Sequence, residues 1–124
     1  MERLLEQILA GILLIAEALG GGSRETEGNV NEVPVPSDRP IKVLSRNKRR
    51  TKWQGQNIDA AVIARYGYSA GQLLSSGAAR GHRIYNNGGA YTDDAMRCHT
   101  GEVWMIAEGA GNPIVVVSEE YKVR

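Results

Sequence analysis

The hydrophobic pattern divides the chain into three parts. In residues 1–19, large apolar side chains recur three and four positions apart, which is typical of an amphipathic helix. Residues 20–40 hold few such side chains, and from residue 41 onward they fall into short runs separated by Gly, Asn and Pro. We therefore predict a mainly β protein: an antiparallel β-sandwich or small barrel over 41–124, preceded by an amphipathic helix and an extended arm.

The N-terminal spacing is that of a heptad repeat. Isoleucine at both core positions disfavours two-stranded coiled coils and favours three or more helices. The apolar surface is also wider than one helix can bury alone. We expect an oligomerisation or docking helix in a homotrimer, with packing of the helix on its own β-domain as the alternative. The seam consists of Leu5, Ile8, Ile12, Ile15 and Leu19.

The segment 20–40 begins with three glycines and holds three of the four prolines, so it cannot build a core of its own. It is either a flexible tether without contacts or an arm that becomes ordered on a partner surface. In the second case, its apolar anchors on that partner are Val30, Val33 and Val35.

Turn signals in the β-domain recur often enough for about eight strands. Residues 59–66 fit either a strand or a short helix, because periodicity does not separate the two. The triplet at 87–89, Asn-Gly-Gly, is a strong turn signal. Residues 102–108 and 113–121 are apolar at most positions and flank a Gly-rich connection, which predicts a central, closing β-hairpin.

Composition and charge narrow the class of protein. The length of 124 residues argues for one small domain with appendages, and the single cysteine excludes an internal disulfide. The net charge of +1 hides an acidic part at 1–40 and a basic part at 41–124. The apolar run at 8–19 is shorter than the roughly 20 residues of a membrane span, and no basic segment precedes it. We expect neither a membrane segment nor a secretory signal.

Residues with catalytic chemistry are few. Cys98 and His99 are adjacent, but neighbouring residues of a strand point to opposite faces, so they do not form a nucleophile pair by adjacency. Together with His82 they are too few for the four ligands of a structural zinc site. The acidic pairs at 93–94 and 119–120 are predicted at turns or solvent-facing strand ends. We expect no enzymatic activity, no cofactor and no metal.

Six positive charges lie within residues 42–52 with no acidic residue among them, and Trp53 follows. Such a run beside an aromatic residue can bind nucleic acid by phosphate attraction and base stacking. It can also be a solvated loop, or a contact for an acidic protein surface such as the arm of a neighbouring copy. We expect a basic contact turn at Arg46, Lys48, Arg49 and Arg50.

Three motifs of the β-domain are similar to those of small β-sandwich domains in tailed-bacteriophage virions. They are an Asn-x-x-Arg turn at 47–50, the Thr100-Gly101 pair before an apolar hairpin, and the acidic end of that hairpin at Glu119 and Glu120. The chain resembles the head decoration, cement and head-fibre proteins of this class, which often form trimers. The resemblance implies a non-enzymatic capsid cement protein that stabilises the assembled head by binding it.

The expected partner is then the major capsid protein or another virion protein, and no membrane is involved. The protein would be made in the host cytoplasm and located on the capsid exterior. Two alternatives stay open. One is a tail- or fibre-associated adaptor or receptor-binding module of the same virion, and the other is a nucleic-acid-binding protein.

Overall fold

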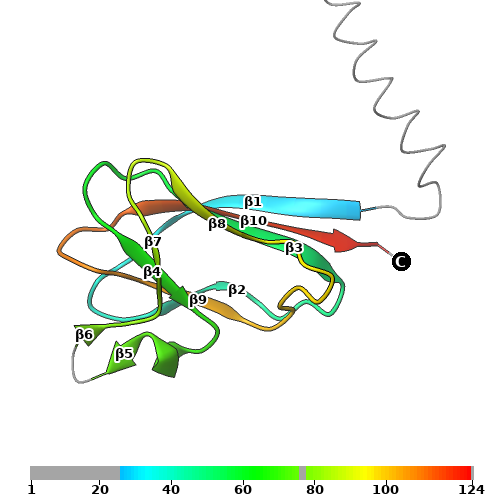
Figure 1. Ribbon diagram of the computed structural model, residues 1–124, viewed down its shortest axis with the longest axis horizontal. Helices are drawn as coiled ribbons and strands as arrows, with labels where there is room; N and C mark the ends of the chain where they lie inside the picture. The colour runs from blue at the N-terminus through cyan, green and yellow to red at the C-terminus, as the bar shows by residue number, and fades with distance from the viewer. Residues whose placement is uncertain (1–25, 76–77, 124) are drawn as a thin grey trace, which may run out of the picture.

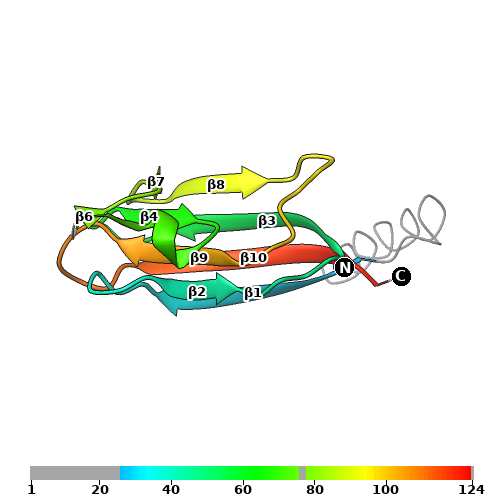
Figure 2. The same ribbon diagram turned by 90° about the horizontal axis from the view of Figure 1, so that it is seen from below.

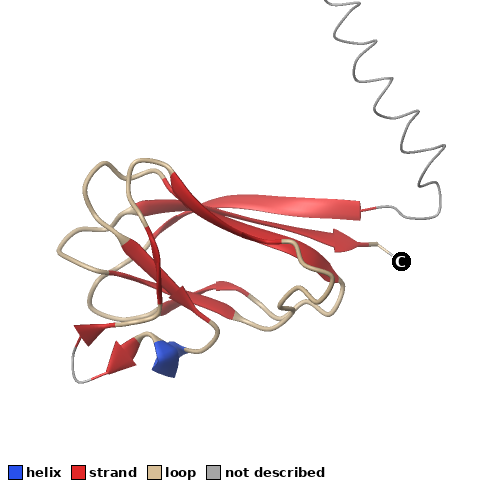
Figure 3. Cartoon of the chain, viewed as in Figure 1, coloured by secondary structure: helices blue, strands red, loops and turns tan. Residues whose placement is uncertain are grey.

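The structure is a computed structural model that describes residues 26–75 and 78–123. Two four-stranded antiparallel sheets pack face to face, as Figures 1 and 3 show. The predicted mainly β class is confirmed, and the architecture is a sandwich of two sheets. The predicted helix at 1–19, with its heptad seam, lies outside the described residues.

The strand order of each sheet can be followed in Figure 2. The first sheet consists of β1 (Thr26–Pro34), β10 (Ile114–Lys122), β3 (Arg50–Asn57) and β8 (Gly89–Asp93). The second sheet consists of β2 (Ile41–Leu44), β9 (Val103–Ala107), β4 (Ala64–Gly67) and β7 (His82–Ile84). A 3-10 turn, η1 (Ala70–Gln72), precedes a small pair of strands, β5 (Leu74–Ser75) and β6 (Ala78–Ala79). No helix of the described residues is long and apolar enough to cross a membrane.

The core lies between the two sheets and is centred on Trp53, which is fully buried. Alternate residues of β3 are buried, as expected for a strand with one face on a core. Gly55 allows the facing sheet to approach closely, because a Cβ at this position would lie 3.0 Å from Met105 Cε and 3.2 Å from Ile84 Cδ1. The inward face of β3 therefore combines one large ring with one position that has no side chain.

The predicted closing hairpin is wrong. β9 pairs with β2 and β4, whereas β10 pairs with β1 and β3, so the Gly-rich connection crosses from one sheet to the other. Both strands are central in their sheets, which explains why both are rich in apolar residues. The apolar runs at 102–108 and 113–121 predicted correctly that both strands are buried, but they did not show that the two strands belong to different sheets.

The predicted boundary at residue 41 is also wrong, because residues 26–40 belong to the folded domain. β1 pairs with β10 along its whole length, and Val35 is fully buried in the core. Val33 is half-buried against the same core, while Val30 is 69% exposed. Val33 and Val35 therefore anchor this segment to its own domain, and only Val30 presents an apolar side chain to solvent.

The two ambiguous local patterns are settled by side-chain hydrogen bonds and backbone geometry. Asp59 Oδ2 accepts hydrogen bonds from the backbone N–H groups of Ala61 and Val62, and this turn leads into β4 rather than into a helix. The same two bonds lower the pKa of the Asp59 carboxyl. The turn predicted at 87–89 is present: Asn87 and Gly88 both have positive φ angles, and the chain passes there from β7 to β8.

Candidate functional site

The basic contact turn lies between β2 and β3 and is held in a defined shape. The backbone N–H of Arg50 donates to the carbonyl of Asn47 at 3.0 Å, and that of Arg49 donates to Asn47 Oδ1 at 3.1 Å. The N–H of Asn47 donates to the carbonyl of Thr100 at 2.8 Å, which ties the turn to the loop before β9. Arg46, Lys48 and Arg49 are exposed on this frame.

Arg50 is not a surface contact residue, contrary to the sequence prediction. Its side chain is fully buried, and its Nε donates to Glu119 Oε1 at 2.9 Å. Its remaining nitrogen atoms donate to the carbonyls of Ser45, His99 and Gly101 at 2.6–2.9 Å. The guanidinium therefore joins the turn, the loop before β9 and strand β10 from inside.

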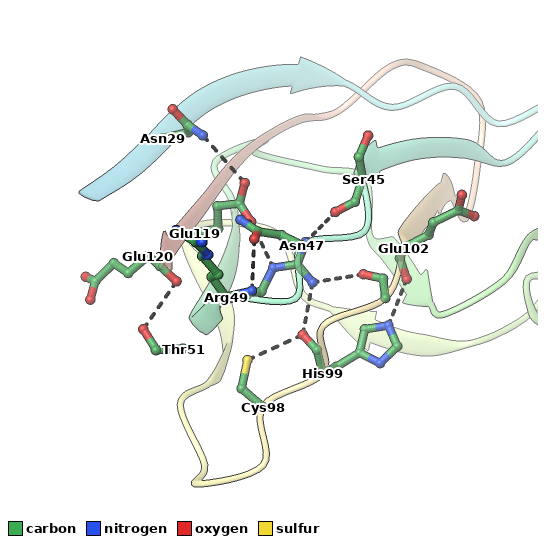
Figure 4. A network of polar contacts seen from close by, with 12 residues as sticks. Asn29, Ser45, Asn47, Arg49, Thr51, Cys98, His99, Glu102, Glu119 and Glu120 are labelled. Carbon is green, nitrogen blue, oxygen red and sulfur yellow. Dashed lines mark hydrogen bonds and ion pairs between the residues drawn. The ribbon is translucent and has the colours of Figure 1, made fainter. Parts of the chain in front are cut away.

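The partners of this guanidinium are satisfied in turn, as Figure 4 shows. Glu119 accepts further contacts at 3.5 Å from the amides of Asn47 and Asn29. A buried ion pair is retained only when its remaining hydrogen-bonding groups find partners, and this pair meets that condition. We call Arg50, Glu119 and Asn47 the Arg50 network. Sequence reasoning named its residues in separate motifs but placed Arg50 on the surface, because a run of cations does not show which of them is buried.

The exposed cations of this end have no acidic partner among the described residues. Arg46, Lys48, Arg49 and Lys122 form no ion pair there, although Arg49 donates to the carbonyl of Val123. An open depression lies beside them and is lined by Lys48–Thr51, the Asp94–Met96 loop, Cys98 and Lys122. Met96 is fully exposed at its rim. The end of the sandwich thus offers several positive charges without an ion pair, next to one apolar side chain, Met96, and one exposed carboxylate, Asp94.

A second group of residues that sequence reasoning missed is an aromatic cluster around Trp53. Tyr66 and Tyr91 stack with ring centroids 4.6 Å apart, and the centroid of each ring lies 5.3 Å from that of Trp53. Burial raises the pKa of Tyr68 to about 12 and also raises that of Tyr66. The alternation of Tyr66 and Tyr68 was the only signal for this cluster. Its rings pack on one another, which identifies it as part of the core.

The candidate catalytic residues are occupied by structural contacts. The His99 ring stacks on Tyr68 with centroids 3.6 Å apart, and its Nε2 lies 2.9 Å from the carbonyl oxygen of Glu102. Cys98 Sγ donates to the carbonyl of Asp93 at 3.4 Å, and burial raises the pKa of the thiol, which disfavours the reactive thiolate. The ring centroid of His82 lies 5.2 Å from that of Tyr66, beside the aromatic cluster. Within the described ranges, no three His, Cys, Asp or Glu side chains gather as metal ligands would.

Comparisons with known proteins add little to this geometry. No protein-family model matches the chain. A search of curated proteins finds no significant match. One solved structure, described as "Bacillus endospore appendages form a novel family of disulfide-linked pili", matches at 10% identity and a TM-score of 0.43. The match covers 83% of this chain and 93% of that chain, and at this level of similarity it supports no conclusion about function.

Proposed function

We propose that this protein is a non-enzymatic structural protein that binds an acidic protein surface through the basic end of its β-sandwich. The observation that carries the proposal is the contrast within the basic run. Arg50 is buried and bonded within the Arg50 network. Arg46, Lys48 and Arg49 are exposed and form no ion pair with any described carboxylate. A rigid frame that presents free charges suits recognition, because little side-chain and loop ordering is needed on binding.

The setting that we propose is the exterior of a tailed-phage head, where the protein would act as a cement or decoration protein. Support comes from the three motifs that resemble such domains. The turn at 47–50, the Thr100-Gly101 pair and Glu119 are distant in sequence, yet all three contribute directly to the hydrogen bonds of the Arg50 network. Motifs that meet in one structural unit are better grounds for a resemblance than scattered ones. The major capsid protein is then the proposed partner, and the homotrimer predicted from residues 1–19 remains part of the proposal.

The same exposed cations favour one rival function, which is nucleic-acid binding. Phosphate contacts by lysine and arginine give an affinity that falls steeply with salt concentration. However, Trp53, the aromatic residue that follows the run, is fully buried and cannot stack on a base. The base-stacking part of the nucleic-acid hypothesis is therefore lost, and only the phosphate attraction of the exposed cations remains.

The test of the proposal removes the three exposed charges and spares the buried one. Arg46, Lys48 and Arg49 are changed together to Ser, and the variant is bound to purified phage heads beside double-stranded DNA at two salt concentrations. Exposed charges contribute about 0–1 kcal/mol each, so head binding should weaken by roughly tenfold through slower association, with folding unchanged. The control variant removes Arg39, Lys42 and Arg80, which lie outside the turn. Equal losses in both variants, or a loss of DNA binding alone, would contradict the proposal.

A further inference from the structure

β1 presents a free edge along the first sheet. Among the described residues it pairs with β10 on one side only, and every residue of β1 except Val33 is exposed. Its pairing covers nine residues without a register shift, whereas the pairing of β10 with β3 contains one. Natural edge strands are usually short, bulged or rich in lysine, because an open edge recruits other strands. β1 is long and has no bulge or lysine, and its edge protections are limited to two glutamates and the terminal Pro34.

The direction of the backbone groups of β1 follows from three observations. Val35 N–H donates to the carbonyl of Pro113, so the odd-numbered residues of β1 bond to β10. Ile58 N–H donates to the carbonyl of Ile114, which shows that even-numbered residues of β10 face β3 instead. Pro34, which has no N–H, occupies an even position, as expected of proline at a free edge. The N–H and C=O groups of Gly28, Val30 and Glu32 therefore point outward.

These outward groups match those of a second copy of the same strand. When two β1 strands run antiparallel about a twofold axis at Val30, all nine residues of each strand find an opposite residue. The outward groups of Gly28 then meet those of Glu32 in the second copy, and Val30 meets Val30 across the axis. On the other face, Asn29 lies opposite Asn31, and Glu27 lies opposite Val33. No two like charges are directly opposed.

We infer that β1 is a self-association edge, on which two copies of this chain join their first sheets into one continuous antiparallel sheet. The twofold contact covers the Val30 side chain, which is 69% exposed in the single chain. It also satisfies the unpaired backbone groups of the longest edge strand among the described residues. This contact is separate from the trimer predicted from residues 1–19, and it does not depend on the proposed function.

The first test removes the outward N–H at the centre of the edge. In Val30→Pro the lost N–H does not bond to β10, so the fold of the single chain is kept, as the natural Pro34 indicates. The control, Val30→Thr, keeps the N–H and a similar side-chain shape. Sedimentation of the full chain should show that Val30→Pro halves the mass of the assembly or weakens its association at least about tenfold. Val30→Thr should assemble like the unmodified chain.

The second test traps the predicted register. Opposed residues of a hydrogen-bonded pair have Cα atoms about 5.5 Å apart, within the range that a disulfide bridges. In a Cys98→Ser background, Val30→Cys should therefore form a covalent dimer on mild oxidation, faster than Thr92→Cys on the exposed opposite edge. Three results would each overturn the inference. They are a monomeric full chain at about 100 μM, an assembly unaffected by Val30→Pro, and equal cross-linking at both positions.

Discussion

At the scale of single residues, the basic run contains both a buried arginine that stabilises the domain and exposed cations that face solvent. Arg50 is buried and makes four polar contacts, while its neighbour Arg49 is exposed. The difference follows from position, because Arg50 is the first residue of β3 and its side chain enters the domain where the loop carbonyls converge. Arg50 thus stabilises the turn between β2 and β3, and that turn presents the charges of Arg46, Lys48 and Arg49 to solvent.

Substitution of Arg50 should therefore cost far more stability than substitution of Arg49. Arg50→Ala leaves Glu119 and three carbonyls without their donor, so the free energy of unfolding should fall by about 3–5 kcal/mol. Arg49→Ala should change it by less than about 0.5 kcal/mol. Urea denaturation of both variants measures the difference. Similar values for the two would mean that the Arg50 network does not stabilise the domain.

The aromatic cluster makes stability sensitive to alkaline pH. The pKa of Tyr68 is raised to about 12, whereas tyrosine in an unfolded chain has a pKa near 10. The folded protein thus retains the proton longer, and the stabilisation is complete below pH 10 and is lost as the pH rises from about 10 to 12. Tyr68→Phe has no such proton and should lose less stability over this interval. Denaturation curves between pH 8 and 12 that fall equally for both proteins would contradict this assignment.

At the scale of elements, β1 and the segment after it complete the sandwich. β1 covers the edge of β10, and Val35 lies fully within the core. Removing residues 1–40 would expose the inner edge of the first sheet and take one buried side chain out of the core. Removing residues 1–25 would leave every described strand in place.

Truncation should reveal this boundary directly. A chain of residues 26–124 should unfold cooperatively, while a chain of residues 41–124 should be unfolded or strongly destabilised.

Val35→Ala should lower the free energy of unfolding by about 1–3 kcal/mol, and Val30→Ala by less than about 0.5 kcal/mol. Circular dichroism during heating compares all four. A stable 41–124 fragment would restore the arm as a separate segment.

The sequence patterns predicted burial well and connectivity poorly. Apolar runs identified β9 and β10, because side-chain burial leaves a direct trace in residue type. The same runs suggested a hairpin, since burial does not report which sheet a strand joins. β1 gave no strand signal, because both of its faces are largely exposed and its side chains do not alternate.

The candidate site was predicted in part for a related reason. The basic turn was found at Arg46, Lys48 and Arg49 because a charge run is visible in the sequence. Arg50 was assigned to the surface with them, since its burial depends on Glu119 and on loop carbonyls that are distant in sequence. The aromatic cluster was missed for the same reason, because its rings come from segments that are distant in sequence.

At the scale of the whole molecule, the described domain combines a rigid sandwich, a basic end and an open edge strand. The basic end and the edge are separate features, so we expect substitutions at one of them to leave the proposed role of the other unchanged. We propose that the basic end recognises an acidic protein surface on a virion head rather than nucleic acid.

The most direct test is the occupancy of the unmodified full chain on purified phage heads, measured beside its affinity for double-stranded DNA at two salt concentrations. If the basic end binds an acidic protein surface, binding to heads should be saturable and binding to DNA weak. Steeply salt-dependent DNA binding without occupancy on heads would contradict it, because that result requires the exposed cations to contact phosphates.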